Sequence, residues 1–92
     1  MIILKSMKNY VAKVIVSLRD DVKDTQGLSV DKMLKRLNIE ENANFRTGKF
    51  YSFRIGAKNL DGAKEKLNFI CSEILSNKVV EKYEIIDLEE LK

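Results

Sequence analysis

The chain of 92 residues contains no histidine, no proline and only one cysteine. Without histidine it lacks the side chain that most often transfers protons near neutral pH, and also the commonest metal ligand. A single cysteine cannot form an internal disulfide, which is compatible with a reducing compartment. Apolar runs are far shorter than a membrane span, so we expect a cytoplasmic protein that needs no membrane.

The composition is that of an ordinary globular domain. Hydrophobic residues make up 45% and charged residues 34% of the chain, which at this length predicts one domain spanning residues 1–92. The formal net charge is +3. Such a mild basic excess is compatible with nucleic acid as a partner but does not point to it.

The first half of the chain predicts a strand followed by a helix. Residues 10–18, YVAKVIVSL, alternate between apolar and mixed positions, as expected for a strand with one buried face. The predicted buried face consists of Tyr10, Ala12, Val14, Val16 and Leu18. Asp24 is suited to cap a helix, and Asn38 to end it. The helical stripe between them comprises Val30, Met33, Leu34 and Leu37, with Leu34 expected to face Val14 and Val16.

The second half predicts a hairpin, a helix and a strand. Residues 43–56, ANFRTGKFYSFRIG, are expected to turn near Thr47 and Gly48, with Tyr51, Phe53 and Ile55 facing the core. Residues 59–76 predict a helix capped by Asn59 or Asp61. Its apolar stripe is Leu60, Ala63, Leu67, Ile70, Cys71 and Ile74. Residues 79–86 predict the last strand, and residues 87–92 a charged tail.

The element order β-α-β-β-α-β predicts an α+β, ferredoxin-like sandwich, with two helices on one face of an antiparallel sheet. The other face would stay uncovered. It would carry Val11, Ile15, Phe50 and Val80 among Lys13, Arg54 and Lys82. An apolar face of this kind must either meet a partner or be tolerated as a surface patch.

An RNA-binding module is the alternative that the segment RTGKFYSF, residues 46–53, suggests. Some RNA-binding sheets stack bases on a basic, glycine-containing and aromatic strand. Such a sheet also needs an aromatic residue in the middle of its first strand, where this chain has none. Because Tyr51 and Phe53 alternate with the predicted core face, we interpret them as core residues.

Three further groups of residues are better explained by structure than by chemistry. Asp20, Asp21 and Asp24 lack the glycine-spaced loop of a calcium site, which favours a solvated loop with a helix cap. Cys71 lies on an apolar stripe and has no histidine to activate its thiol. The four glycines form no phosphate-binding loop. The residues therefore indicate a non-catalytic domain that acts through a partner.

Three segments together resemble the PurS family, the small subunit of formylglycinamidine ribonucleotide synthase. The strand at 10–18 is followed by DTQG at 24–27, similar to the family's D-P-Q-G. RTGKF at 46–50 resembles R-x-G-K-aromatic, and CSEILSNKVVEKY at 71–83 resembles C-x-x-L-L-x-N-x-V-I-E-x-Y. The chain departs from the pattern at Thr25, where proline is usual, and at Asn38, where glycine is frequent. Residues 1–6 look like an extension, with Met7 as an alternative start.

The resemblance implies a role in de novo purine biosynthesis. A synthetase subunit (PurL) would use ATP and Mg, and a glutaminase subunit (PurQ) would release ammonia. The PurS-like chain would have no catalytic residues and bind no cofactor or metal itself. It would form a homodimer or higher even oligomer that joins the two subunits and supports ammonia transfer, without nucleic acid.

The matching motifs also suggest which residues contact those partners. On the predicted fold, Arg46 to Lys49 form an exposed hairpin tip. The candidate partner-binding residues are Asp24, Gln26, Gly27, Arg46, Gly48, Lys49, Asn77, Glu81 and Tyr83.

Overall fold

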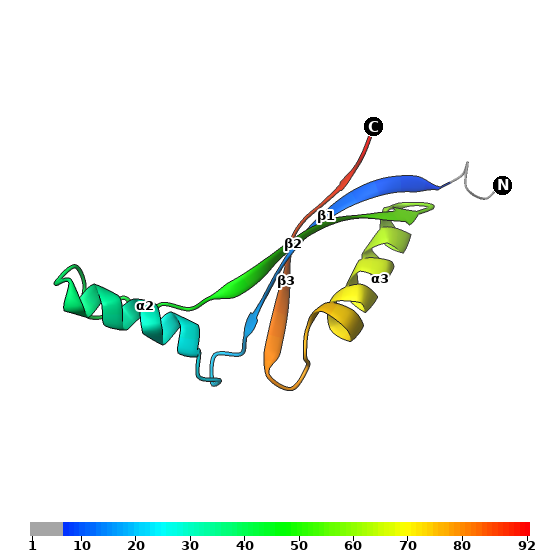
Figure 1. Ribbon diagram of the computed structural model, residues 1–92. Helices are drawn as coiled ribbons and strands as arrows, with labels where there is room; N and C mark the ends of the chain where they lie inside the picture. Colours follow the sequence, from blue (N-terminus) through cyan, green and yellow to red (C-terminus); the bar gives the residue numbers. More distant parts are fainter. Residues whose placement is uncertain (1–6) are drawn as a thin grey trace.

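Figure 1 shows a computed structural model of the chain, in which residues 7–92 are described. The expected N-terminal extension, residues 1–6, lies outside the described residues. The elements in chain order are β1 Lys8–Leu18, α2 Thr25–Arg36, β2 Gly48–Ala57, α3 Leu60–Ile70, the π-helical turn η1 Cys71–Leu75 and β3 Glu81–Glu90. The described part of the chain thus has the order β-α-β-α-β. This order confirms the predicted α+β class.

Within residues 7–92 the strands form one antiparallel sheet in the order β2-β1-β3. Val14 of the central strand lies opposite Tyr51 on one side and Ile85 on the other. Alternate residues of β1 are buried, from Tyr10 to Val16, while Leu18 is half-buried. The period of two predicted for this strand is therefore confirmed.

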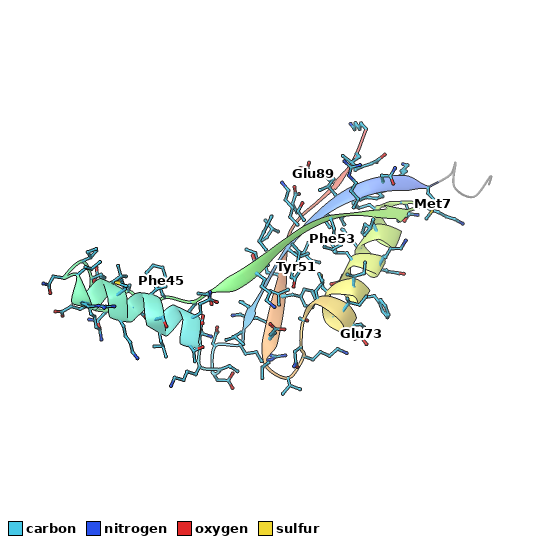
Figure 2. The ribbon with its side chains drawn as sticks, in the orientation of Figure 1. Met7, Phe45, Tyr51, Phe53, Glu73 and Glu89 are labelled. Carbon is cyan, nitrogen blue, oxygen red and sulfur yellow. The ribbon has the colours of Figure 1, made fainter. Side chains whose placement is uncertain are left out.

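The core lies between the sheet and α3. Ala63, Leu67 and Cys71 are fully buried on the side of α3 and η1 that faces β1 and β2. Tyr51 and Phe53 pack against this core from β2, on the side of the sheet that α3 covers (Figure 2). The core interpretation of Cys71 and of both aromatic residues is confirmed.

The far end of the predicted α3 stripe is wrong. Ile74 is 68% exposed, although it follows the spacing of the buried residues before it. A π-helical turn has more residues per turn than an α-helix, so η1 rotates Ile74 away from the sheet. Leu60, at the first turn of α3, is also exposed.

The helix α2 forms where expected but not against the sheet. Asp24 caps it, and Asn38 has the left-handed φ of 57° predicted for its end. However, α2 projects away from the sheet and from α3, and the molecule is 61 Å long but only 17 Å thick (Figure 1). The prediction that both helices cover one face of the sheet is therefore wrong for a single copy of the chain. Leu34 is half-buried outside the core that contains Val14 and Val16.

The predicted hairpin is also wrong. Residues 43–47 form no strand, and the chain runs from Thr47 into β2 without a turn (Figure 1). The reason is local: the amide of Phe45 donates to the Asp31 carboxylate at 3.1 Å, and that of Thr47 donates to Asp24 at 2.5 Å. These bonds hold the segment beside α2. We call residues 24–47 the arm, and β1, β2, α3, η1 and β3 the body.

The last strand is longer than predicted. β3 continues to Glu90, so Asp87 to Glu90 belong to the sheet and not to a charged tail. A register shift between Lys13 and Val14 interrupts the alternation in β3, which hid the continuation of the strand from a pattern of period two. Val80 lies in the turn before β3, not on the open face.

Candidate functional site

The three motifs lie far apart in the sequence but meet at one end of the sheet. β1 ends there, while β2 and β3 begin there. Ser17 lies opposite Gly48 on β2 and opposite Lys82 on β3. The loop after β1 leads from the same end into the arm (Figure 1). We call this end of the body the motif end.

Asp24 is the centre of the first polar cluster, although its side chain is only 4% exposed. Its carboxylate accepts hydrogen bonds from the Gly27 amide at 2.9 Å, from the Thr47 amide at 2.5 Å and from the Thr47 hydroxyl at 2.9 Å. The bonds from the Gly27 and Thr47 amides hold the pKa of Asp24 below its ordinary value, because they stabilise the charged form. Asp24 therefore joins the beginning of the arm to its end.

Both motif glycines are explained by close packing of the backbone. A Cβ atom on Gly27 would lie 2.2 Å from the carbonyl oxygen of Phe45, which is too close for any side chain. A Cβ atom on Gly48 would lie 3.0 Å from the carbonyl oxygen of Val16. In this structure the D-T-Q-G and R-T-G-K segments hold one another in place.

Two arginines connect the arm to the loop after β1 and to the turn before β3. Arg46 Nη2 donates to the carbonyl oxygen of Arg19 at 2.9 Å. Arg19 donates from Nε and Nη2 to the carbonyl oxygen of Lys78, at 3.2 and 2.9 Å. Arg46 is exposed but lies in a hydrogen-bonded chain, so its predicted place at a hairpin tip is wrong, whereas its contact with a partner stays a prediction.

The third motif shapes the turn before β3. The Asn77 amide donates to Glu81 Oε1 at 2.7 Å, and Asn77 Oδ1 accepts from the Val79 amide at 3.0 Å. The Tyr83 hydroxyl donates to Asn68 Oδ1 of α3 at 3.0 Å. These bonds fix the turn, so Asn77, Glu81 and Tyr83 have structural partners in the body itself.

Four of the candidate residues present their side chains to solvent, namely Gln26, Arg46, Lys49 and Asn77. Gln26 and Lys49 are exposed and lie at the rim of an open cavity of about 220 Å³. The candidate residues that line this cavity are Asp24, Gln26, Gly48, Lys49 and Glu81. Its volume is below the roughly 300–1,000 Å³ of ordinary small-molecule sites. The motif end is therefore better suited to a protein surface than to a small ligand.

Within residues 7–92 the acidic and cysteine side chains form no cluster that could hold a metal ion. Burial raises the pKa of the Cys71 thiol, which disfavours the reactive thiolate. Neither helix in this part of the chain is long and apolar enough to cross a membrane.

Thr47, Asp31 and Arg19 are important at this site but were absent from the predicted set. Asp24 and Asp31 are seven residues apart, which is about two helical turns, so both lie on one side of α2. That spacing is a signal for a segment that runs along the helix. Thr47 stands inside the R-T-G-K motif, whereas nothing in the sequence singles out Arg19.

Comparison with known proteins gives one family. The family model PurS, described as phosphoribosylformylglycinamidine (FGAM) synthase, matches residues 11–89. The subunit PurS of phosphoribosylformylglycinamidine synthase from Synechocystis is 31% identical over 83 residues, covering 88% of this chain and 83% of the relative.

Solved structures agree with the sequence relatives. PurS from Thermus thermophilus has a TM-score of 0.76 and 32% identity, covering 91% of this chain and 99% of that chain. A chain in the structure of PurLQS from Thermotoga maritima has a TM-score of 0.75 and 29% identity, covering 90% of this chain and 98% of its own length. The similarity extends over nearly the whole length of this chain and of both matched chains.

Proposed function

The chain belongs to the PurS family of phosphoribosylformylglycinamidine synthase subunits, and we propose that it serves that synthase as a non-catalytic assembly subunit in purine biosynthesis. The family match over residues 11–89 carries this proposal. The lack of histidine and the buried thiol of Cys71 support a role without chemistry of its own.

The partners that we propose are a synthetase subunit and a glutaminase subunit in the cytoplasm. The synthetase would use ATP and Mg, and the present chain would bind neither. Its contribution is to hold the glutaminase where released ammonia reaches the synthetase. The similarity to a chain of PurLQS supports partners of these two kinds. We also propose that the subunit works as a homodimer or a higher even oligomer.

The motif end is the proposed docking surface, with Lys49 as its main contact. Lys49 is exposed at the start of β2, and an ammonium group there can pair with a carboxylate of a partner. Arg46 has a different role, because its guanidinium already donates to Arg19 within the chain. Separate substitutions of the two residues therefore distinguish docking from folding.

The test compares Lys49→Ala with Lys58→Ala, which removes an exposed lysine just after the other end of β2. The chain is mixed with the synthetase and glutaminase subunits, all three at limiting concentration, and activity is measured with glutamine and with ammonia. We expect Lys49→Ala to weaken assembly about tenfold, equivalent to ~1.4 kcal/mol. Glutamine-dependent activity should fall more than ammonia-dependent activity, because free ammonia bypasses the glutaminase.

The controls separate the possible explanations. Lys58→Ala should leave assembly and activity unchanged, and Lys49→Ala should keep the wild-type fold. An equal loss of activity with both nitrogen sources would mean that Lys49 contacts the synthetase alone. No loss of activity would mean that Lys49 is an ordinary solvated surface residue. Turnover of glutamine or ATP by the isolated chain would contradict the non-catalytic role.

A further inference from the structure

The third family motif contains two apolar side chains that the fold does not bury. Val79, in the turn before β3, is 81% exposed, the largest value for any large apolar side chain among residues 7–92. Ile74, in η1, is 68% exposed. Neither side chain therefore contributes much apolar burial to the stability of the chain. Because a single exposed apolar residue is normal, what surrounds these two decides their meaning.

The two side chains lie at the same end of the body. Lys78 Nζ and Glu73 Oε2 are 2.5 Å apart, and this ion pair joins η1 to the turn. Glu73 directly precedes Ile74, and Lys78 directly precedes Val79, so the ion pair holds the two apolar residues in adjoining segments. Figure 2 shows Glu73 at the end of the helix nearest this turn. We call Ile74 and Val79, together with this ion pair, the turn patch.

The turn that carries Val79 is fixed by hydrogen bonds on both sides. The Val79 amide donates to Asn77 Oδ1 at 3.0 Å. From the loop after β1, the Arg19 guanidinium donates twice to the carbonyl oxygen of Lys78, at 3.2 and 2.9 Å. The Arg19 amide also donates to the carbonyl oxygen of Val80 at 2.8 Å. The turn therefore has one defined form, although it lies at the surface.

The residue at position 79 is not one that a turn needs. Turns favour glycine, proline, asparagine, aspartate and serine, each for a reason of backbone conformation or hydrogen bonding. Valine offers none of these, and its branched Cβ restricts the side chain to few rotamers. A stiff apolar side chain on a fixed turn loses little conformational entropy when a partner covers it. Val79 is therefore preorganised for docking.

The surroundings of the turn patch are those of an interface centre, which is apolar within a polar rim. The side chains of Lys78 and Glu73 are 65% and 41% exposed. On the loop side, Lys82 Nζ lies 2.8 Å from Asp20 Oδ1. Exposed ion pairs of this kind contribute little to stability, so their charges are available to pair with groups of a partner.

We propose that the turn patch docks on the synthetase subunit, in an apolar hollow edged by charged groups. A chain that joins two partners needs two separate docking surfaces. In the strand order β2-β1-β3, Lys49 stands at the start of one outer strand and the turn patch directly before the other. The proposed function gives the Lys49 side to the glutaminase, which leaves the turn patch for the synthetase. This inference rests on the proposed function and names the surface for its second partner.

The experiment measures binding of the full chain to each purified partner subunit by calorimetry. Ile74→Ser with Val79→Ser removes both apolar side chains. We expect the double variant to bind the synthetase at least about tenfold more weakly, because a few central apolar contacts carry most of the binding free energy. Its binding to the glutaminase should stay unchanged. The matched control is Leu60→Ser, which alters an apolar residue 44% exposed at the opposite end of the body and should bind both subunits as wild type does.

The outcomes separate the turn patch from the proposed function. Weaker binding to the synthetase alone supports the proposal. Equal weakening with both subunits, or no change with either, overturns it. A wild-type chain that binds neither subunit overturns the proposed function itself, and this is seen before any substitution. The melting temperature and the mass in solution should match those of the wild type, because both substituted side chains are exposed.

A second pair of variants tests the rigidity of the turn while the apolar side chains stay in place. Asn77→Ala removes the acceptor of the Val79 amide and should weaken binding to the synthetase. Asn77→Asp keeps an acceptor oxygen at the same position and should restore most of that binding. Equal binding by the two variants, whether weakened or not, would overturn the claim that the fixed turn presents Val79 to the partner.

Discussion

The body and the arm are stabilised by different interactions. The body buries a continuous apolar core, in which Leu67 and Cys71 are fully inaccessible. The arm is held by hydrogen bonds to two carboxylates, those of Asp24 and Asp31, and by the close approach of Gly27 to Phe45. Its apolar side faces outward.

This difference shows how a small domain can contain two kinds of surface. A body with its own core supplies most of the folding free energy, since apolar burial is the dominant favourable contribution. An arm that is shaped by polar bonds keeps a defined form while its apolar residues remain free for association. The three motifs of the family lie where the two regions join.

The sharpest test of this contrast uses the same substitution in both regions. Leu67→Ala removes a fully buried side chain of the body and should cost roughly 2–5 kcal/mol of unfolding free energy at any protein concentration. Leu37→Ala, in the arm, should cost less than about 0.5 kcal/mol in dilute monomer. Denaturant unfolding in dilute solution measures both, and equal costs would remove the distinction.

Glycine substitutions test the close packing at the base of the arm. Gly27→Ala would place a methyl group 2.2 Å from the Phe45 carbonyl oxygen, and we expect a loss of about 1–3 kcal/mol. The control is Gly62→Ala in the first turn of α3, where the nearest atom is 3.4 Å away. It should be neutral or stabilise by up to ~1 kcal/mol. Similar losses at both sites would contradict the packing described for the arm.

The carboxylate of Asp24 predicts a smaller, pH-dependent effect. Its pKa is lowered in the folded state by the Gly27 and Thr47 amides, so the folded chain holds fewer protons than the unfolded chain in acid. The contribution of Asp24 is therefore complete above its unfolded pKa and is lost as pH falls through the lower folded value. The melting temperatures of wild type and Asp24→Asn should differ near pH ~6 and converge toward pH ~2.

The matched control for this titration is Asp21→Asn, three residues away in the same loop and exposed. Its difference from wild type should be small. If the Asp24→Asn difference stayed constant from neutral pH into acid, the charged form of Asp24 would not be what stabilises the arm.

Local patterns predicted the elements better than their arrangement. The alternation in residues 10–18 and the caps at Asp24 and Asn59 are local signals, and all three match the structure. The register shift near Val14 and the π-helical turn after Ile70 change the period midway, so a fixed spacing misplaced Ile74 and the end of β3. Such irregularities depend on packing that the sequence pattern does not contain.

The sequence predicted which residues form the motif end but not which contacts they make. The motifs contain Asp24, Gly27 and Arg46, yet sequence alone assigned them to partner contacts. The structure gives each of them a partner within the chain. Thr47 and Gly48 have the composition of a turn. However, the bonds from the Phe45 and Thr47 amides to Asp31 and Asp24 keep the chain extended there. Competition between a local turn and distant carboxylates cannot be judged from spacing.

Amide hydrogen exchange in dilute solution tests the separation of arm and body most directly. Protection reports local opening, which costs least free energy where few apolar contacts are buried. We expect the amides of α2, whose large apolar side chains are mostly exposed, to be less protected than those of α3, which covers the buried core. Equal protection of the two helices would contradict this account, since the arm would then be as stable as the body.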